Sequence, residues 1–92
     1  MSKEKNTTTV DEFFKALDDE NVCAHHYSIN VSRYGRHFFA TTDHSLMTER
    51  DTRAMMEIFV EKFPKSEGYE IMINAHIEYA HYVSYIFAYI KN

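Results

Sequence analysis

The chain has 92 residues, a formal net charge of −4 and a hydrophobic content of 45%, with one cysteine, two glycines and one proline. This length fits a single domain (1–92) with one core, which excludes a catalytic domain beside a regulatory one. The only thiol, Cys23, cannot form an internal disulfide, so we expect a protein of a reducing compartment such as the cytoplasm.

The first residues combine charges and hydroxyls without an apolar run, so we expect residues 1–8 to be a flexible N-terminus and not a secretory signal. Thr9 and Glu12 then have the spacing of a capping box, which marks the start of a helix. Apolar residues follow at helical spacing, namely Val10, Phe13, Phe14 and Leu17. The pattern predicts a helix of about ten residues that ends near Asn21.

After this helix the apolar residues recur at every second position. Over residues 25–32, Tyr27, Ile29 and Val31 alternate with polar side chains, which is typical of a half-buried strand. Tyr34-Gly35 comes next, and glycine can adopt the positive φ that a tight turn requires. Because the apolar run 37–40 follows directly, the sequence predicts a β-hairpin.

Thr48 and Asp51 repeat the capping spacing, and a second helix is predicted from there to a residue before Pro64. We expect its buried face to consist of Met47, Ala54, Met55, Ile58, Phe59 and Phe63. Beyond Pro64, the strict alternation over 70–79 predicts a third strand.

Residues 80–90 allow two interpretations. They contain no Gly, Pro, Asn or Asp to turn a hairpin, yet one strand over 70–90 would be unusually long. We favour a closing helix, although the composition favours strands, because one helical face gathers Tyr79, Tyr82, Val83, Ile86 and Ile90. The predicted fold class is α+β: a small antiparallel sheet, made of the hairpin and a third strand, with two to three helices packed on one face. The other face is left for a partner.

Six histidines raise the question of a metal site. Their spacing argues against one, because neighbouring His25 and His26 would point to opposite faces of a strand and no paired-ligand motif accompanies them. The candidate ligands are Cys23, His25, His26, His37, His44, His76 and His81. We expect none of them to bind a metal, and we expect no cofactor.

The sequence also lacks the patterns of catalysis. Neither Cys23 nor a serine stands beside a glycine-rich oxyanion loop, and two glycines make no phosphate-binding loop. We therefore expect no enzyme activity and no small-molecule substrate. The aromatic stretch near the C-terminus is too short to span a bilayer, so no membrane role is expected either.

Charge is unevenly distributed along the chain. The residues Glu49, Arg53 and Glu57 are four apart and predict ion pairs within the second helix, whereas residues 18–20 are too few acids for a DNA mimic. Residues 21–42 contain no acidic residue, and the predicted hairpin tip lies within them. Its side chains can contact a phosphate backbone and stack on a base, so the candidate partner- or RNA-binding residues are Asn30, Ser32, Arg33, Tyr34, Arg36 and His37. A surface turn that simply carries charge is the alternative.

Three segments carry a resemblance to a known group of proteins: SKEKNTTTVDEFFKALDDE, YSINVSRYGRHFFATT and EYAHYVSYIFAYIKN. With the size and composition, they make the whole chain similar to the small phage-encoded anti-CRISPR proteins that act on the type I-F surveillance complex. The resemblance implies a stoichiometric inhibitor in the host cell cytoplasm, which binds Cas backbone and tail subunits and the guide RNA and prevents target DNA from hybridising. A small nucleic-acid-binding or transcriptional regulator is the alternative.

Overall fold

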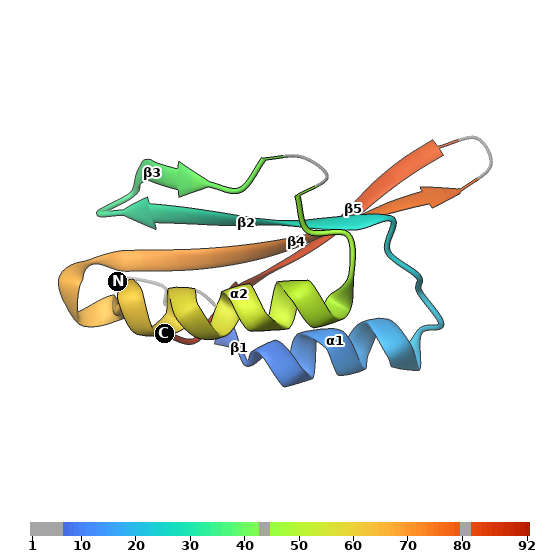
Figure 1. Ribbon diagram of the computed structural model, residues 1–92, viewed down its shortest axis with the longest axis horizontal. Helices are drawn as coiled ribbons and strands as arrows, with labels where there is room; N and C mark the ends of the chain where they lie inside the picture. Colours follow the sequence, from blue (N-terminus) through green and yellow to red (C-terminus); the bar gives the residue numbers. More distant parts are fainter. Residues whose placement is uncertain (1–6, 43–44, 80–81) are drawn as a thin grey trace, which may run out of the picture.

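The computed structural model describes residues 7–42, 45–79 and 82–92 of the chain. Its elements follow one another as β1 (Thr7–Thr8), α1 (Val10–Asp19), β2 (His26–Arg33), β3 (Arg36–Ala40), α2 (Glu49–Lys62), the 3₁₀ turn η1 (Lys65–Glu67), β4 (Tyr69–Tyr79) and β5 (Tyr82–Ile90). The strands form one sheet in the order β1-β5-β4-β2-β3, and both helices lie below the same face of it (Figure 1). The expected α+β class, with helices on one face of a mostly antiparallel sheet, is confirmed. No helix in the described ranges is long and apolar enough to cross a membrane.

Helix α1 begins where the capping box predicted. The Thr9 hydroxyl accepts a hydrogen bond from the Glu12 backbone N–H at 3.1 Å, and the Thr9 backbone N–H donates to Glu12 Oε1 at 3.3 Å. The Thr9 hydroxyl also donates to Glu12 Oε1 at 2.9 Å, and this hydrogen bond, followed by the one from the Thr9 backbone N–H, lowers the pKa of the Glu12 carboxyl below its ordinary value. The apolar stripe, Phe13, Phe14 and Leu17, is buried against the sheet and α2 as expected. Residues 1–8 were expected to be a flexible N-terminus. Of these, Thr7–Thr8 form β1, and residues 1–6 lie outside the described residues.

The predicted hairpin is present, with a turn of two residues. Tyr34 has φ 50° and Gly35 φ 80°, and positive φ at both central positions defines the type I′ turn that matches the twist of paired strands. The register of β3 on β2 shifts between Val31 and Ser32, which marks a bulge. Tyr27, Ile29 and Val31 are buried on the helix side, as the alternation predicted.

Helix α2 starts after Thr48, whose hydroxyl accepts the Asp51 N–H at 3.1 Å, and it ends at Lys62 before Pro64. Its buried face agrees with the prediction in part, because Phe59 is buried and Met55 and Phe63 pack against the core. Thr52, Met56 and Phe59 are buried, whereas Ile58 is 46% exposed and Met47 and Ala54 are exposed as well. The expected burial of Ile58 was wrong because the helix turns its Thr52–Met56–Phe59 stripe to the sheet, and a position two residues from Met56 then lies on the far side.

Residues 82–90 form strand β5, so the closing helix that the sequence analysis favoured is wrong. The strand pairs with β4 over its whole length, from Tyr82 opposite Tyr79 to Ile90 opposite Ile71. This pairing supplies backbone partners for the long strand β4, which a helix would have left at the edge of the sheet. The aromatic and β-branched composition of 82–90 agrees with that outcome. The connection between the two strands, residues 80–81, lies outside the described residues.

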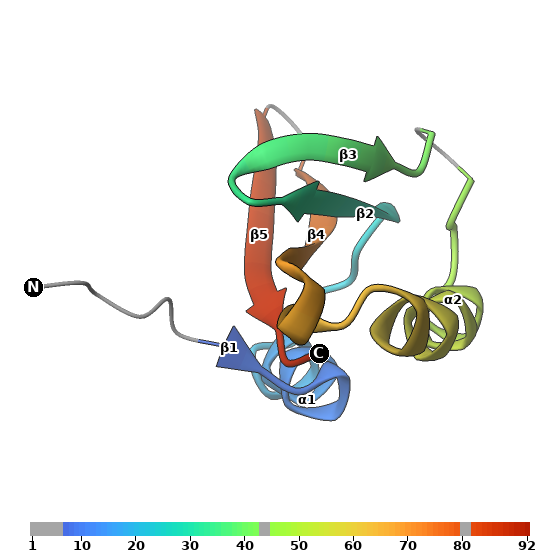
Figure 2. The same ribbon diagram turned by 90° about the vertical axis from the view of Figure 1, so that its left-hand side faces the viewer.

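The sheet has one face inside the core and one face without a helix. Figure 2 shows α1 and α2 together on one side of the curved sheet, while no helix or strand of the described residues covers the opposite side of β2, β4 and β5. On the helix side, the odd residues of β4 from Ile71 to Ile77 are buried, together with Ile90 of β5. Because side chains alternate along a strand, the even residues of β4 and the odd residues of β5 project from the uncovered face.

Candidate binding surfaces

The hairpin tip gathers the basic residues singled out in the sequence, but it divides the six candidates between two faces. Arg33 and Arg36 are register partners and therefore share the helix side of the hairpin. Asn30 and Ser32 lie opposite Met72 and Glu70 on the uncovered face, where His37, opposite Ser32, also lies. Tyr34 stands at the turn itself and is 75% exposed. The six residues thus do not form one continuous site.

Arg33 is held in place by the segment before β4. Its Nε donates to the Glu67 carbonyl oxygen at 3.0 Å, and its guanidinium carbon lies 4.8 Å from the ring centroid of Tyr69 and 5.4 Å from that of Tyr34. These partners are neutral, so they orient the guanidinium without neutralising its charge. Arg36, directly across the hairpin, is exposed. Within the described ranges, no carboxylate forms an ion pair with either arginine.

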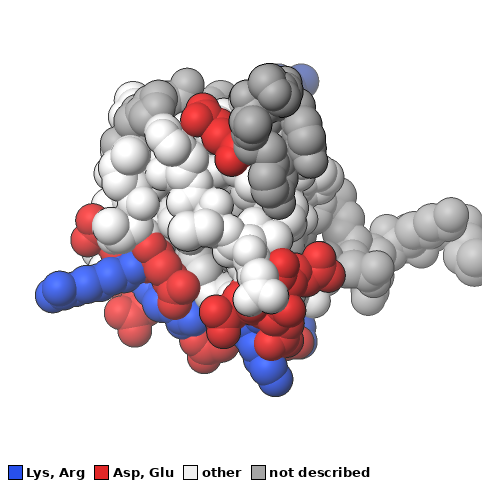
Figure 3. Space-filling model, turned by 90° about the vertical axis from the view of Figure 1, so that its right-hand side faces the viewer, with Lys and Arg blue, Asp and Glu red and all other residues white. Residues whose placement is uncertain are grey.

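A second surface, which the sequence analysis did not find, lies on β5. Val83, Tyr85 and Phe87 project from the uncovered face and are 50%, 56% and 60% exposed. We call these three residues the β5 strip. In a strand over 82–90 these three residues occupy alternate positions and share one face. The sequence analysis missed the strip because it favoured a helix there. Figure 3 shows charged side chains gathered over the helix layer, in the lower part of the view.

Three histidines that are separated in the sequence meet next to this strip. The rings of His26 and His76 stack with centroids 4.2 Å apart, His25 Nδ1 lies 3.2 Å from His26 Nδ1, and His76 contacts the Tyr85 ring at 4.9 Å. His76 also lies 3.3 Å from a carboxylate oxygen of Glu78. Among the described residues, no three histidine, cysteine or acidic side chains are arranged to hold a metal ion. His44 and His81 lie outside those residues.

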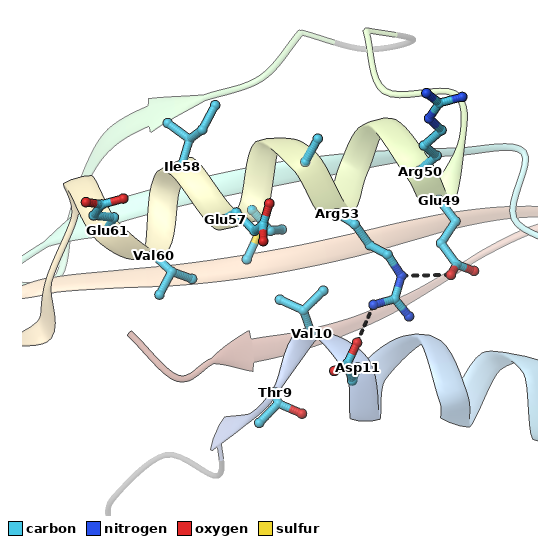
Figure 4. Close-up of a pocket in the computed structure, with 12 residues that line it drawn as sticks. Thr9, Val10, Asp11, Glu49, Arg50, Arg53, Glu57, Ile58, Val60 and Glu61 are labelled. Atoms are coloured by element: carbon cyan, nitrogen blue, oxygen red, sulfur yellow. Dashed lines mark hydrogen bonds and ion pairs between the residues drawn. The ribbon is translucent and has the colours of Figure 1, made fainter.

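A third surface is the groove between α1 and α2, drawn in Figure 4. Arg53 closes one end of it, because its guanidinium pairs with Glu49 at 2.8 Å within α2 and with Asp11 of α1. The pairing with Glu49 was predicted from the spacing, and the bridge to α1 was not. Val10 and Val60 line the groove, and the acids Glu57 and Glu61 stand along α2 on its rim.

Comparison with known proteins adds no relative. No protein-family model matches the chain, and neither the curated proteins nor the solved structures contain a significant match.

Proposed function

We propose that this chain is a phage-encoded anti-CRISPR protein that binds the crRNA-guided type I-F Cas surveillance complex stoichiometrically and blocks target DNA hybridisation. The resemblance of the whole chain to small inhibitors of that complex supports the proposal. In this proposal the protein acts in the host cell cytoplasm by contact with Cas subunits and guide RNA, without a catalytic step and without a cofactor.

One structural observation carries the proposal: the like-charged pair Arg33 and Arg36 at the hairpin tip. Equal charges directly opposite each other on two strands destabilise a hairpin. A local arrangement that costs stability is expected where a function requires it. Two guanidiniums without a described carboxylate partner are a ready site for an anion, and a nucleic-acid backbone presents such anions in series.

The rest of the tip suits a guide RNA better than free duplex DNA. Arg33 is already oriented by the Glu67 carbonyl and by Tyr69, so little side-chain entropy is lost when it meets a phosphate. Tyr34 presents an exposed ring on which an unpaired base can stack. The net charge of −4 opposes unspecific attraction to long nucleic acids, so affinity has to come from local contacts and from protein partners.

The test is the affinity for a purified, crRNA-loaded type I-F complex. We expect wild type to bind and to prevent added target DNA from hybridising, and the double variant Arg33→Ala/Arg36→Ala to bind at least tenfold more weakly, because each charged contact contributes about 1.5–3 kcal/mol. Its affinity should also depend less steeply on salt. The matched control is Lys15→Ala/Arg50→Ala, which removes two exposed positive charges from the helices and should bind like wild type.

Two results would contradict the proposal. If wild type does not bind the loaded complex, the function is another one. If wild type binds free DNA or RNA with submicromolar affinity at physiological salt, the regulator alternative is correct. Thermal melting of each variant shows that a lost affinity is not a lost fold.

A further inference from the structure

Among the residues that the structure describes, the outer backbone edge of strand β5 has a strand partner only at its C-terminal end. The only described strand on that side, β1, is two residues long and pairs with Tyr89 and Ile90 alone. The Lys91 N–H donates to the Thr8 carbonyl across this edge. Because backbone groups point to alternate sides of a strand, the N–H and C=O groups of residues 83, 85 and 87 face the same edge. Figure 2 shows the short β1 at one end of β5, with the rest of the strand running beyond it.

The two edges of the sheet differ in how they are protected. The edge strands of proteins that remain monomeric are usually short, charged, bulged or interrupted by proline. The β3 edge has several of these features: five residues, Arg36 at its start and a bulge beside it. The sequence of β5, YVSYIFAYI, contains no charge and no proline over nine residues. The exposed side chains of the β5 strip add apolar area beside this edge.

These observations favour a second copy of the same chain as the occupant of the edge. In a two-fold pairing each residue meets its own counterpart or a close neighbour, so a strand with charged residues would place like charges together, and β5 has none. The segment 83–87, which no described strand pairs with on this edge, is centred on Tyr85. An antiparallel pair about this residue places Tyr85 opposite Tyr85 and Val83 opposite Phe87, and aromatic and β-branched residues are favourable cross-strand partners.

We infer that two chains associate through their β5 strands, antiparallel and centred on Tyr85, to form one continuous sheet across a two-fold axis. The buried area of this interface indicates how strong the association is. A fully buried aromatic side chain covers about 150–250 Å², so the exposed parts of Tyr85 and Phe87 and their neighbours offer roughly 400–500 Å² per chain. Both chains together then bury on the order of 1,000 Å², the lower limit of a specific interface. The dimer is therefore weak, with a dissociation constant of roughly 10–100 µM.

Sedimentation of the purified chain from about 5 to about 500 µM tests this inference over the range of the expected dissociation constant. The average mass should rise from 10.9 kDa toward twice that value. Tyr85→Lys and Tyr85→Glu should each weaken self-association at least tenfold, because equal charges then meet at the axis. A mixture of the two variants should associate again, since Lys faces Glu only in the mixed dimer. The matched control Ile58→Lys, at a half-exposed apolar residue of α2, should behave like wild type.

A mass that stays at 10.9 kDa over the whole range would overturn the inference, as would a Tyr85→Lys variant that dimerises like wild type. If the mixture of Tyr85→Lys and Tyr85→Glu stays monomeric, the pairing of β5 strands is not centred on Tyr85. If Ile58→Lys loses the dimer, the interface lies on the helices and not on β5. The assay contains no Cas protein and no RNA, and Arg33→Ala/Arg36→Ala should dimerise normally. Failure of the dimer and failure of the proposed function are therefore distinguishable.

Discussion

The ring of Tyr34 lies directly over Gly68. A Cβ added to Gly68 would stand 2.5 Å from Tyr34 Cζ and 2.6 Å from Tyr34 Cδ1, closer than real Cβ atoms approach other atoms. The Tyr34 N–H also donates to the Gly68 carbonyl at 3.0 Å. The tip of the β2–β3 hairpin is thereby attached to the turn that precedes β4, and the absence of a side chain at position 68 makes this contact possible.

The two glycines provide a matched test of this contact. Both have a positive φ, +80° at Gly35 and +88° at Gly68, but a Cβ on Gly35 would meet nothing within 4 Å. Gly35→Ala should therefore cost only the backbone strain, about 1–2 kcal/mol of unfolding free energy, and Gly68→Ala should cost more because the Tyr34 ring must move. In a Tyr34→Ala background the extra cost should disappear. Urea denaturation of Gly35→Ala and Gly68→Ala, each in the wild-type and in the Tyr34→Ala background, measures this extra cost. Equal costs of the two substitutions in the wild-type background would show that the ring contact contributes nothing.

The buried face of α2 can be tested with two truncations. Met56→Ala should lower the unfolding free energy by about 2–5 kcal/mol, because the Met56 side chain is 0% exposed and its removal leaves a cavity. Ile58→Ala should cost less than about 1 kcal/mol, since this side chain is half in solvent. Chemical denaturation compares them. If Ile58→Ala cost more unfolding free energy than Met56→Ala, Ile58 would be a core residue, as its helical spacing predicted.

Arg36 should be unfavourable for stability and favourable for binding. Arg36→Gln removes the repulsion from Arg33 and should raise the unfolding free energy by about 0.2–1 kcal/mol, while binding to the loaded surveillance complex weakens. Arg36→Lys keeps the charge and should change stability little. The gain should shrink at high salt, where exposed charges are screened. Thermal melts at two salt concentrations check this, and a less stable Arg36→Gln would show that the pair is not repulsive.

Tyr27 should make the fold sensitive to alkaline pH. Burial, followed by the nearby Glu49 carboxylate, raises the pKa of its phenol above 10.0. The unfolded chain then loses the Tyr27 proton at a lower pH than the folded chain. The protonated Tyr27 phenol therefore contributes to the free energy of unfolding fully below about pH 10, and this contribution is lost as pH rises through the folded pKa. Stability should fall less steeply with pH in Tyr27→Phe, measured by denaturation from about pH 8 to about pH 11. Tyr85→Phe, at an exposed ring, is the control and should decline like wild type.

Local signals in the sequence were sufficient for most of the elements. The Thr9–Glu12 capping box, the alternation around Ile29 and the Tyr34-Gly35 turn each depend on neighbours a few residues away, and all three appear where they were predicted. The α+β class follows from the order of these elements. The basic residues of the hairpin tip were also recognisable, because Arg33 and Arg36 are close together in a stretch without acids.

Tertiary contacts decided the rest. Residues 82–90 combine the spacing of a helical face with a composition that favours strands, and the strand forms because β4 requires a hydrogen-bonding partner along its length. The side of α2 that is buried depends on how the helix is rotated against the sheet, so Met56 and not Ile58 enters the core. The meeting of His26 with His76, the support of Arg33 by Tyr69 and the open edge of β5 all join residues far apart in the chain. No local pattern encodes such pairings, because they arise only when the strands take their places in one sheet.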